Sequence, residues 1–204
     1  MKIIKASYLI QLLEPPIDML KRIERAGRVC YKSEDKITDI SYVQMLKKLI
    51  DSQHESVLEH GVASVKFICD RGISHELVRH RIASFSQEST RYCNYSKDKF
   101  GEELTFISPD FELSPHDEYL LFQIETHYIS RLREGLSPQQ ARYFLPNGLK
   151  TELVMTCNLR EWRHIFKLRT SPRAHPQMRE LMVPLLKDFQ DLIPVVFDDL
   201  SCSR

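Results

Sequence analysis

The sequence predicts an α+β fold in a single domain, residues 1–204, with more helix than strand. The chain length suits one domain, and a hydrophobic content of 42% is enough to form a core. Apolar residues repeat at helical spacing in most segments, whereas a few segments alternate apolar and polar residues as strands do. No internal repeat, low-complexity tract or linker rich in Gly, Ser or Pro divides the chain.

The first half of the chain contains signals for two strands and three helices. Thr38 is expected to cap the second of these helices, and the polar residues 54–60 should connect it to the following strand. The expected elements are a strand over 2–13, helices over 17–28 and 38–53, a strand over 62–69 and a helix over 71–82, followed by a loop or irregular strand through Tyr95.

The second half carries three clear helix starts. Ser114 and Ser137 each precede a proline at the first helical position, and Asn158 stands three residues before Glu161, which is capping-box spacing. Pro184 is placed where it could kink the last helix. The expected elements are a strand over 104–107, helices over 114–134 and 137–144, a strand over 149–156, and helices over 158–169 and 175–191.

The composition argues against several classes of protein. A formal net charge of +1 disfavours a general nucleic-acid-binding protein, which usually carries a strong basic excess. The five cysteines are scattered and form no Cys-x-x-Cys pair, which disfavours a disulfide framework or a zinc site and suits a reducing cytoplasm. The N-terminus lacks the apolar run of a signal peptide, and no segment approaches the length of a membrane span.

Residues 79–92 concentrate three arginines, a histidine, three serines and a threonine. Arginine forks match phosphate and carboxylate oxygens, so this stretch indicates an anionic ligand, and the alternative is a solvated basic face. Residues two apart on a helix point about 200° apart, so Arg79 and Arg81 would serve two ligands or two sides of a subunit boundary. A further alternative pairs Glu76 with His80 across one helical turn and leaves Arg81 in solvent.

Any phosphate group would have to be bound by side chains, because the sequence has neither Gly-x-Gly-x-x-Gly nor Gly-x-x-x-x-Gly-Lys-Ser/Thr. His54 and His60 do not share a helical face as metal ligands would, so no metal site is expected. Roughly a third to a half of the candidate arginines should be functional. These candidates are Arg79, Arg81, Arg91, Arg142, Arg160, Arg163, Arg169 and Arg173.

Five ordered motifs resemble the flavin-dependent thymidylate synthase (ThyX) family over nearly the whole chain. The signature is Arg79-His80-Arg81 followed by seven residues and Ser89. The other matches are the segment from His54 to His60, the segment from Ala141 to Pro146, Asn158-Leu159-Arg160 with His164 and Leu168-Arg169, and the segment from Ala174 to Arg179.

The resemblance implies a fold, an activity and an assembly. The fold would be a single domain with a central, mainly antiparallel sheet and flanking helices. The activity would be that of a cytoplasmic methyltransferase that converts dUMP to dTMP, with 5,10-methylenetetrahydrofolate as carbon donor and FAD reduced by NADPH as hydride source. The assembly would be a homotetramer with shared active sites and with no nucleic-acid, membrane or metal partner.

The resemblance also assigns residues to sites. Arg169 would be the catalytic cation at the pyrimidine edge, where it would stabilise the negative charge of the activated ring. Position 76 is Glu where the family often has Gln, and position 87 is Gln where it often has Glu. FAD would be held by Ser56, Arg79, His80, Arg81, Gln87, Asn158, Leu159, Arg160 and His164. dUMP would contact Glu76, Leu77, Val78, Arg79, Gln87, Glu88, Ser89, Thr90, Arg91, Arg142 and Arg169.

The residues favour a mechanism without a protein nucleophile. None of the cysteines follows a proline, so the Pro-Cys nucleophile of the unrelated thymidylate synthases is missing. Ser89 has no evident base in its immediate sequence, and an unactivated serine is a weak nucleophile. We therefore expect Ser89 to donate a hydrogen bond to the nucleotide.

Two other classes of function stay open from the sequence alone. A small RNA- or DNA-binding module would use arginines interleaved with Phe85, Tyr92 and Tyr95, which could stack on bases. A purely structural helical protein would use the basic segment as an oligomer interface.

Overall fold

The computed structural model describes residues 1–12 and 14–201 and divides the chain into two compact units. The segments Met1–Ser7, Phe67–Arg79 and Phe85–Val154 form what we call the first unit. The segments Tyr8–Lys66, His80–Ser84 and the chain from Met155 onward form the second unit. The units interleave along the sequence, and the single domain over residues 1–204 stays a prediction.

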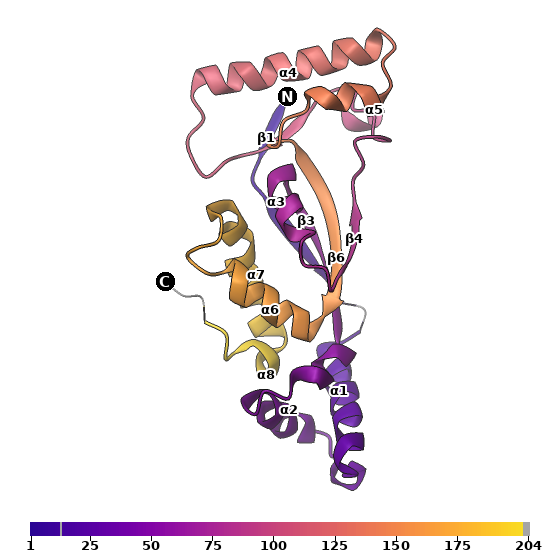
Figure 1. The fold of residues 1–204 in the computed structure, drawn as a ribbon, viewed down its shortest axis with the longest axis vertical. Coiled ribbons are helices and arrows are strands. Elements are labelled where there is room, and N and C mark those ends of the chain that lie inside the picture. The colour runs from indigo at the N-terminus through magenta and orange to yellow at the C-terminus, as the bar shows by residue number, and fades with distance from the viewer. Residues whose placement is uncertain (13, 202–204) are drawn as a thin grey trace. The chain divides into compact units, whose positions relative to one another are not determined.

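The described strands form two sheets (Figure 1). In the larger sheet the order is β2-β3-β6-β4, and in the smaller one β1 pairs in parallel with β5, so that Ile3 lies opposite Phe106. The strands are β1 Lys2–Ile4, β2 Ser7–Gln11, β3 Val62–Asp70, β4 Ser84–Gln87, β5 Thr105–Ile107 and β6 Lys150–Asn158. The predicted α+β class, with an antiparallel sheet and flanking helices, is confirmed.

Helices account for most of the remaining described chain. The α-helices are α1 Pro16–Tyr31, α2 Ser41–Asp51, α3 Arg71–Leu77, α4 Pro115–Arg133, α5 Pro138–Ala141, α6 Leu159–Arg169, α7 Pro176–Leu192 and α8 Pro194–Phe197. The 3-10 helices are η1 Glu34–Lys36, η2 Glu55–His60, η3 Asp98–Phe100 and η4 Arg142–Phe144. Among the described residues, none of these helices is long and apolar enough to cross a lipid bilayer.

The three helix starts predicted from capping signals are confirmed. Ser114 forms a reciprocal capping box with Asp117, and Ser137 forms one with Gln140. The Asn158 side chain accepts a hydrogen bond of 2.8 Å from the backbone N–H of Glu161 and so caps α6. These signals are reliable because cap and first turn lie within four residues.

Four predicted features of the first half of the chain differ from the structure. The strand over 2–13 is two strands, because β1 pairs with β5 while β2 belongs to the larger sheet; Leu13 lies outside the described residues. Thr38 does not cap α2, which begins at Ser41; instead the Ser41 hydroxyl accepts from the Thr38 N–H at 2.8 Å. The polar connector 54–60 contains the 3-10 helix η2.

The fourth difference concerns the basic segment. The helix predicted over 71–82 ends at Leu77, where the Val78 N–H donates to Ser74 and closes the last turn. Arg79 and Arg81 therefore lie beyond the helix, and the expectation that their side chains point about 200° apart, which assumes a helix, was wrong. For the same reason Glu76 and His80 are not one turn apart on a helix.

Each unit has its own core. In the first unit Tyr95, Phe106, Tyr128 and Leu149 belong to one buried cluster. In the second unit the Trp162 indole is fully buried and donates to the Ala63 carbonyl at 3.0 Å, which ties α6 to β3. The rings of Phe166 and Phe189 pack against Trp162. Pro184 lies within α7, which continues through it to Leu192.

Candidate functional site

The end of β4 in the first unit is anchored by Gln87. Its side-chain amide donates to the hydroxyls of Ser74 at 2.9 Å and Thr151 at 3.2 Å. A neutral amide held by two hydroxyls suits a hydrogen-bonding role and leaves no acid at this position. The predicted contacts of Gln87 with flavin and nucleotide stay predictions.

Glu88 is held entirely by groups of the first unit. One carboxylate oxygen accepts from the Tyr95 hydroxyl at 2.8 Å, and the other accepts from the Lys150 ammonium at 3.1 Å. Its backbone N–H donates to the Glu152 carbonyl at 2.8 Å. Burial raises the pKa of Tyr95, and the charge of Glu88 raises it further. Glu88 therefore fixes the turn that follows it, and Tyr95 and Lys150 are supporting residues that sequence reasoning missed.

The turn after Glu88 closes on Ser89. The Ser89 carbonyl accepts from the N–H groups of Tyr92 and Cys93, and its hydroxyl accepts from the Arg91 N–H at 3.3 Å. Thr90 is buried in this turn. A hydroxyl that accepts at one lone pair keeps its proton for donation to a ligand, which suits the predicted role of Ser89.

Arg91 and Arg142 are both adjacent to α5 on the surface of the first unit. Both are exposed, and the Arg91 Nε–H donates to the Gln139 side chain at 3.1 Å. Gln139 belongs to α5, and Arg142 follows it by three residues at the helix end. Since residues three apart on a helix are neighbours, both guanidinium groups reach the same part of the surface.

The predicted dUMP contacts around the end of α3 differ in how far their side chains are exposed. The Leu77 side chain is fully buried, so only its backbone could contact a ligand. Glu76 and Val78 are half-buried, and Arg79 is exposed. Leu159 of the second unit resembles Leu77, because its side chain is also fully buried.

The second unit contains a cavity of about 550 Å³ between η2 and α6. Three residues predicted to bind flavin line it, namely Asn158, Arg160 and His164. Ser56 is exposed on η2, and the exposed Arg81 precedes a further lining residue, Ile82. The complete lining is Glu55, Glu59, Ile82, Asn158, Arg160, Glu161, His164 and Lys167.

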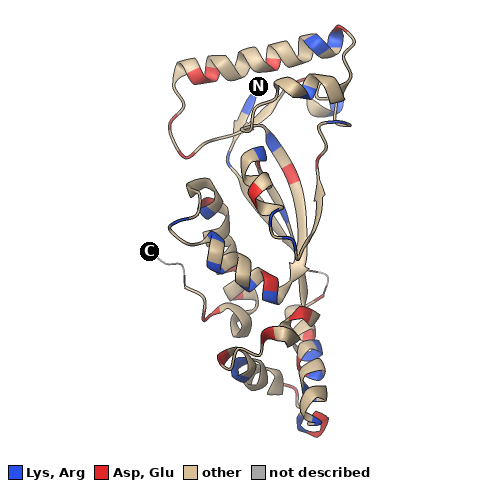
Figure 2. Ribbon diagram, in the orientation of Figure 1, with Lys and Arg blue, Asp and Glu red and all other residues tan. Residues whose placement is uncertain are grey.

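One face of α6 supplies basic side chains to this cavity. Arg160, His164 and Lys167 follow one another at spacings of four and three residues, which places them on one side of the helix. Basic residues mark α6 along its length, and its acid, Glu161, lies in the first turn (Figure 2). Sequence reasoning missed Lys167, although the same spacing could have revealed it.

The glutamates of η2 are already neutralised by arginines. Arg160 pairs with Glu59 at 2.6 Å, and Arg163 donates to Glu55 at 3.1 Å. Arg163 is only 2% exposed and also forms a bidentate pair with Asp199 and a hydrogen bond to the Val196 carbonyl. Arg163 is therefore a core residue of the second unit, and its selection as a phosphate candidate was wrong.

The buried His80 and the half-buried Arg169 form a hydrogen-bonded pair in the second unit. The Arg169 Nε–H donates to His80 Nε2 at 2.9 Å, while His80 Nδ1 lies 3.7 Å from a Glu161 carboxylate oxygen. Burial lowers the pKa of His80 to about 4, and the neighbouring Arg169 and His164 contribute in the same direction. His80 is therefore neutral at pH 7, and it does not pair with Glu76 as the alternative proposed, since both ring nitrogens face α6.

The same place offers the ligand types of a metal site. Among the described residues, ligand atoms of His80, Glu161 and His164 lie within 4.8 Å of one another. The hydrogen bond from Arg169 occupies His80 Nε2, so the ring proton sits on Nδ1, the nitrogen that faces Glu161. A metal at Nδ1 would have to displace that proton, which disfavours binding there.

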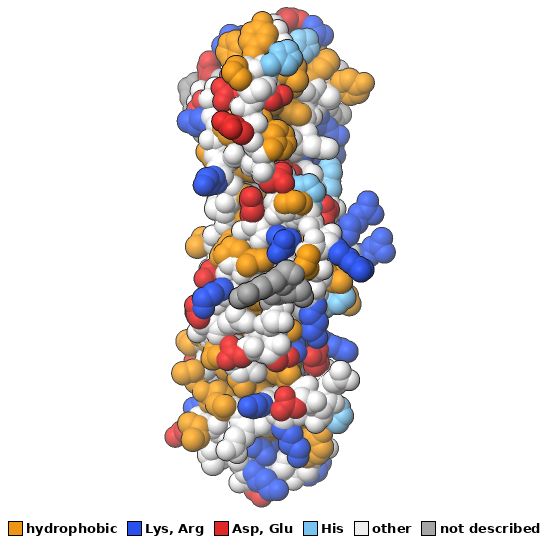
Figure 3. All heavy atoms as spheres, turned by 90° about the vertical axis from the view of Figure 1, so that its left-hand side faces the viewer, with side chains coloured by type: hydrophobic (Ala, Val, Ile, Leu, Met, Phe, Trp, Pro, Cys, Tyr) orange, Lys and Arg blue, Asp and Glu red, His pale blue; other side chains and the backbone are white. Residues whose placement is uncertain are grey.

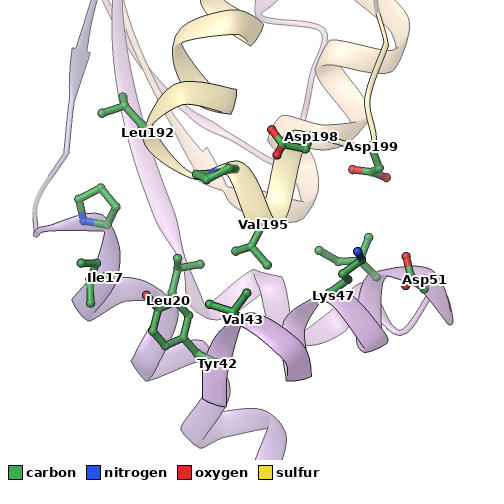
Figure 4. Close-up of a pocket in the computed structure, with 13 residues that line it drawn as sticks. Ile17, Leu20, Tyr42, Val43, Lys47, Asp51, Leu192, Val195, Asp198 and Asp199 are labelled. Carbon is green, nitrogen blue, oxygen red and sulfur yellow. The ribbon is translucent and has the colours of Figure 1, made fainter. Parts of the chain in front are cut away.

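A second cavity in the second unit is lined by other residues. It measures about 470 Å³ and lies where α1 and α2 meet α8, with Ile17, Leu20 and Val43 facing Val195 (Figure 4). None of the predicted site residues belongs to its lining.

The predicted dUMP contacts and the predicted FAD contacts lie mostly in different units. All the predicted dUMP contacts except Arg169 lie in the first unit. All the predicted FAD contacts except Arg79 and Gln87 lie in the second unit. Each unit thus brings together most of one set.

A family model and curated relatives match most of this chain. Residues 11–195 match the family model described as thymidylate synthase complementing protein. The flavin-dependent thymidylate synthase of Geobacter sulfurreducens is 33% identical over 200 residues, covering 93% of this chain and 85% of that protein. The Mycobacterium avium protein of the same description is 36% identical over 204 residues, covering 89% and 79%.

A solved structure supports the fold. The UMP/dUMP methylase PolB from Streptomyces cacaoi, bound with 5-Br dUMP, superposes with a TM-score of 0.73. The alignment covers 97% of this chain and 96% of that one, at 22% sequence identity.

Proposed function

The chain belongs to the flavin-dependent thymidylate synthase family, and on that premise we propose that it converts dUMP to dTMP by reductive methylation. The observation that carries the proposal is the distribution of charge at the Ser89 turn. The acid of the turn, Glu88, faces inward to Lys150, which it shares with Glu152, whereas Arg91 and Arg142 are exposed. Two exposed guanidinium groups beside a turn suit the phosphate of a nucleotide.

Ser89 and Arg169 would act on the rest of the nucleotide. Ser89 would donate a hydrogen bond from its hydroxyl to the substrate, since its oxygen already accepts from the backbone N–H of Arg91. Arg169 would place a fixed cation at the pyrimidine edge and stabilise the negative charge that develops there. Its hydrogen bond to the buried His80 restricts its side-chain conformations before substrate arrives.

The cavity of the second unit suits part of FAD. Its volume of about 550 Å³ lies in the usual range for ligand sites, and Arg160, His164 and Lys167 offer N–H donors for phosphate oxygens. Glu55 and Glu59 would not repel an anionic cofactor strongly, since arginines pair with both. When bound, FAD reduced by NADPH supplies the hydride, and 5,10-methylenetetrahydrofolate supplies the carbon.

The same proposal includes a cytoplasmic homotetramer with shared active sites. Its support in the first unit is an exposed apolar surface on α4 that includes Tyr119, Leu120 and Phe122. Exposed hydrophobic side chains are visible in the region of α4 in Figure 3. Apolar surfaces of this kind are typical of contacts between protein subunits.

One preparation tests the proposal. Purified protein supplied with FAD should show flavin absorption bands that change on addition of dUMP. dTMP should form only when dUMP, NADPH and 5,10-methylenetetrahydrofolate are all present. Protein that binds neither FAD nor dUMP, or that forms no dTMP from the complete mixture, would overturn it. Binding of an oligonucleotide in place of dUMP would support the nucleic-acid-binding alternative.

A further inference from the structure

Three side chains of the second unit form a continuous polar chain. Arg169 at the end of α6 donates to His80 Nε2 at 2.9 Å, and His80 Nδ1 lies 3.7 Å from Glu161 in the first turn of α6. His80 and Glu161 are both buried, with exposed fractions of 6% and 8%. The separation of 3.7 Å is just beyond hydrogen-bond distance, so the contact with Glu161 is electrostatic.

The direction of the Arg169 hydrogen bond decides the tautomer of His80. A guanidinium group can only donate, so His80 Nε2 must accept and cannot carry a proton. The single proton of the neutral ring then sits on Nδ1 and points toward the Glu161 carboxylate. Arginine and glutamate therefore both favour the same tautomer from opposite sides of the ring.

We propose that Glu161 is a positioning residue for Arg169 and acts through the tautomer and orientation of His80. This inference rests on the proposed function, in which Arg169 meets the pyrimidine ring. Glu161 is well placed for the role, because the Asn158 side chain fixes its backbone at the start of α6. Without an acceptor facing Nδ1, the ring can rotate or shift its proton to Nε2, and it then repels the Arg169 N–H.

The tautomer can be measured directly in the wild-type protein. Nitrogen NMR of protein labelled with ¹⁵N-histidine distinguishes protonated from unprotonated ring nitrogens, and a His80→Gln sample assigns the signal. At pH 7.5 we expect His80 to be neutral with its proton on Nδ1. A proton on Nε2, or a doubly protonated ring, would overturn the inference. This readout does not depend on turnover, so its failure is distinct from failure of the proposed function.

Two variants of Glu161 separate positioning from structural support. Glu161→Leu removes the carboxylate that faces Nδ1 and should lower kcat at least tenfold when measured at saturating FAD, with the KM for dUMP changed by less than threefold. Glu161→Gln keeps an oxygen that can accept from Nδ1–H, so it should retain kcat within threefold of wild type.

A matched control is the other buried glutamate of the second unit, Glu24, which pairs with Arg28 on α1. Glu24→Gln should leave kcat within twofold even if it lowers Tm. Loss of flavin from Glu161→Leu in proportion to its loss of activity would overturn the inference, and so would full activity of that variant. If Glu161→Leu does not fold, a Glu161→Gln protein with the Nε2–H tautomer of His80 overturns it instead.

Discussion

The two candidate sites differ in how far their charged side chains are exposed to solvent. At the Ser89 turn of the first unit the acid faces inward to Lys150 and Tyr95, and the arginines Arg91 and Arg142 face solvent. In the second unit three charged or titratable groups near the cavity are buried, namely His80, Glu161 and Arg163, whereas Arg160 and Lys167 on its lining are exposed. The arginines at the Ser89 turn are therefore available to bind an anion. The buried groups of the second unit are already bound to one another and to neighbouring residues.

This difference predicts how each site responds to mutation. Exposed arginines contribute little to folding, so changing them should alter ligand binding and leave stability almost intact. Buried groups must keep their partners, so changing them should alter stability and function together. The four variants below test this contrast, from the largest expected effect to the smallest.

Arg169→Ala should have the largest effect. Removal of a fixed charge that meets the transition state typically costs about a hundredfold or more in kcat. The variant also leaves His80 Nε2 buried without its donor, which should lower the free energy of unfolding by about 1–3 kcal/mol. Rates of dTMP formation and urea unfolding measure the two effects. A kcat within tenfold of wild type would contradict the catalytic role of Arg169.

Asp199→Ala should affect stability and leave the first unit's site alone. Arg163 loses its bidentate partner but keeps Glu55 and the Val196 carbonyl, so we expect a loss of about 2 kcal/mol at pH 7.

The stability loss of Asp199→Ala should depend on pH. The hydrogen bond from Arg163 lowers the pKa of Asp199. A carboxyl group with a lowered folded-state pKa stabilises the protein above its unfolded pKa of about 3.9, and that stabilisation is lost as pH falls through the folded value. The difference between wild type and variant should therefore shrink below about pH 4 in urea unfolding. A difference that is constant from pH 7 to pH 3 would argue against the ion pair.

Arg142→Ala should weaken substrate binding without affecting folding. Loss of one charge-assisted hydrogen bond to phosphate should raise the KM for dUMP about tenfold, with Tm unchanged. Arg133→Ala is the matched control, since Arg133 is an exposed arginine of α4 in the same unit. Equal KM values for the two variants would remove Arg142 from the site.

Lys167→Ala should have the smallest effect. An exposed ammonium group near a cofactor phosphate contributes under about 1 kcal/mol, so FAD affinity should fall about threefold and less at high salt. Lys187→Ala on α7 is the control, because Lys187 is also exposed and pairs with an acid. Flavin titration by fluorescence measures both variants. A larger loss for Lys187→Ala would show that α6 is not the binding face.

The sequence predicted what depends on neighbouring residues. The cap residues Ser114, Ser137 and Asn158 were found because each contacts a group three residues away. The end of α3 was not found, because Ile82 continues the apolar spacing of that helix although the chain leaves it at Leu77. The division of residues 2–13 into two strands also depends on distant pairing partners.

The same limit applies to the site residues. The motif predicts Glu88 as a substrate contact, but the hydrogen bonds of Glu88 with Tyr95 and Lys150 join residues up to 62 positions apart in the sequence. Lys167 could have been found from helical spacing alone. The contact of His80 with Arg169 spans 89 positions and needed the structure.

Because the two units interleave along the sequence, the chain cannot be divided into two fragments that each contain one complete unit. The strands β3 and β6 each begin in one unit and end in the other, and the chain passes between the units at five points. Cleavage at any of these points leaves at least one unit short of a segment. Neither half of the gene should therefore encode an autonomous folding module, and exchange of one unit with that of a relative would require several coordinated splices.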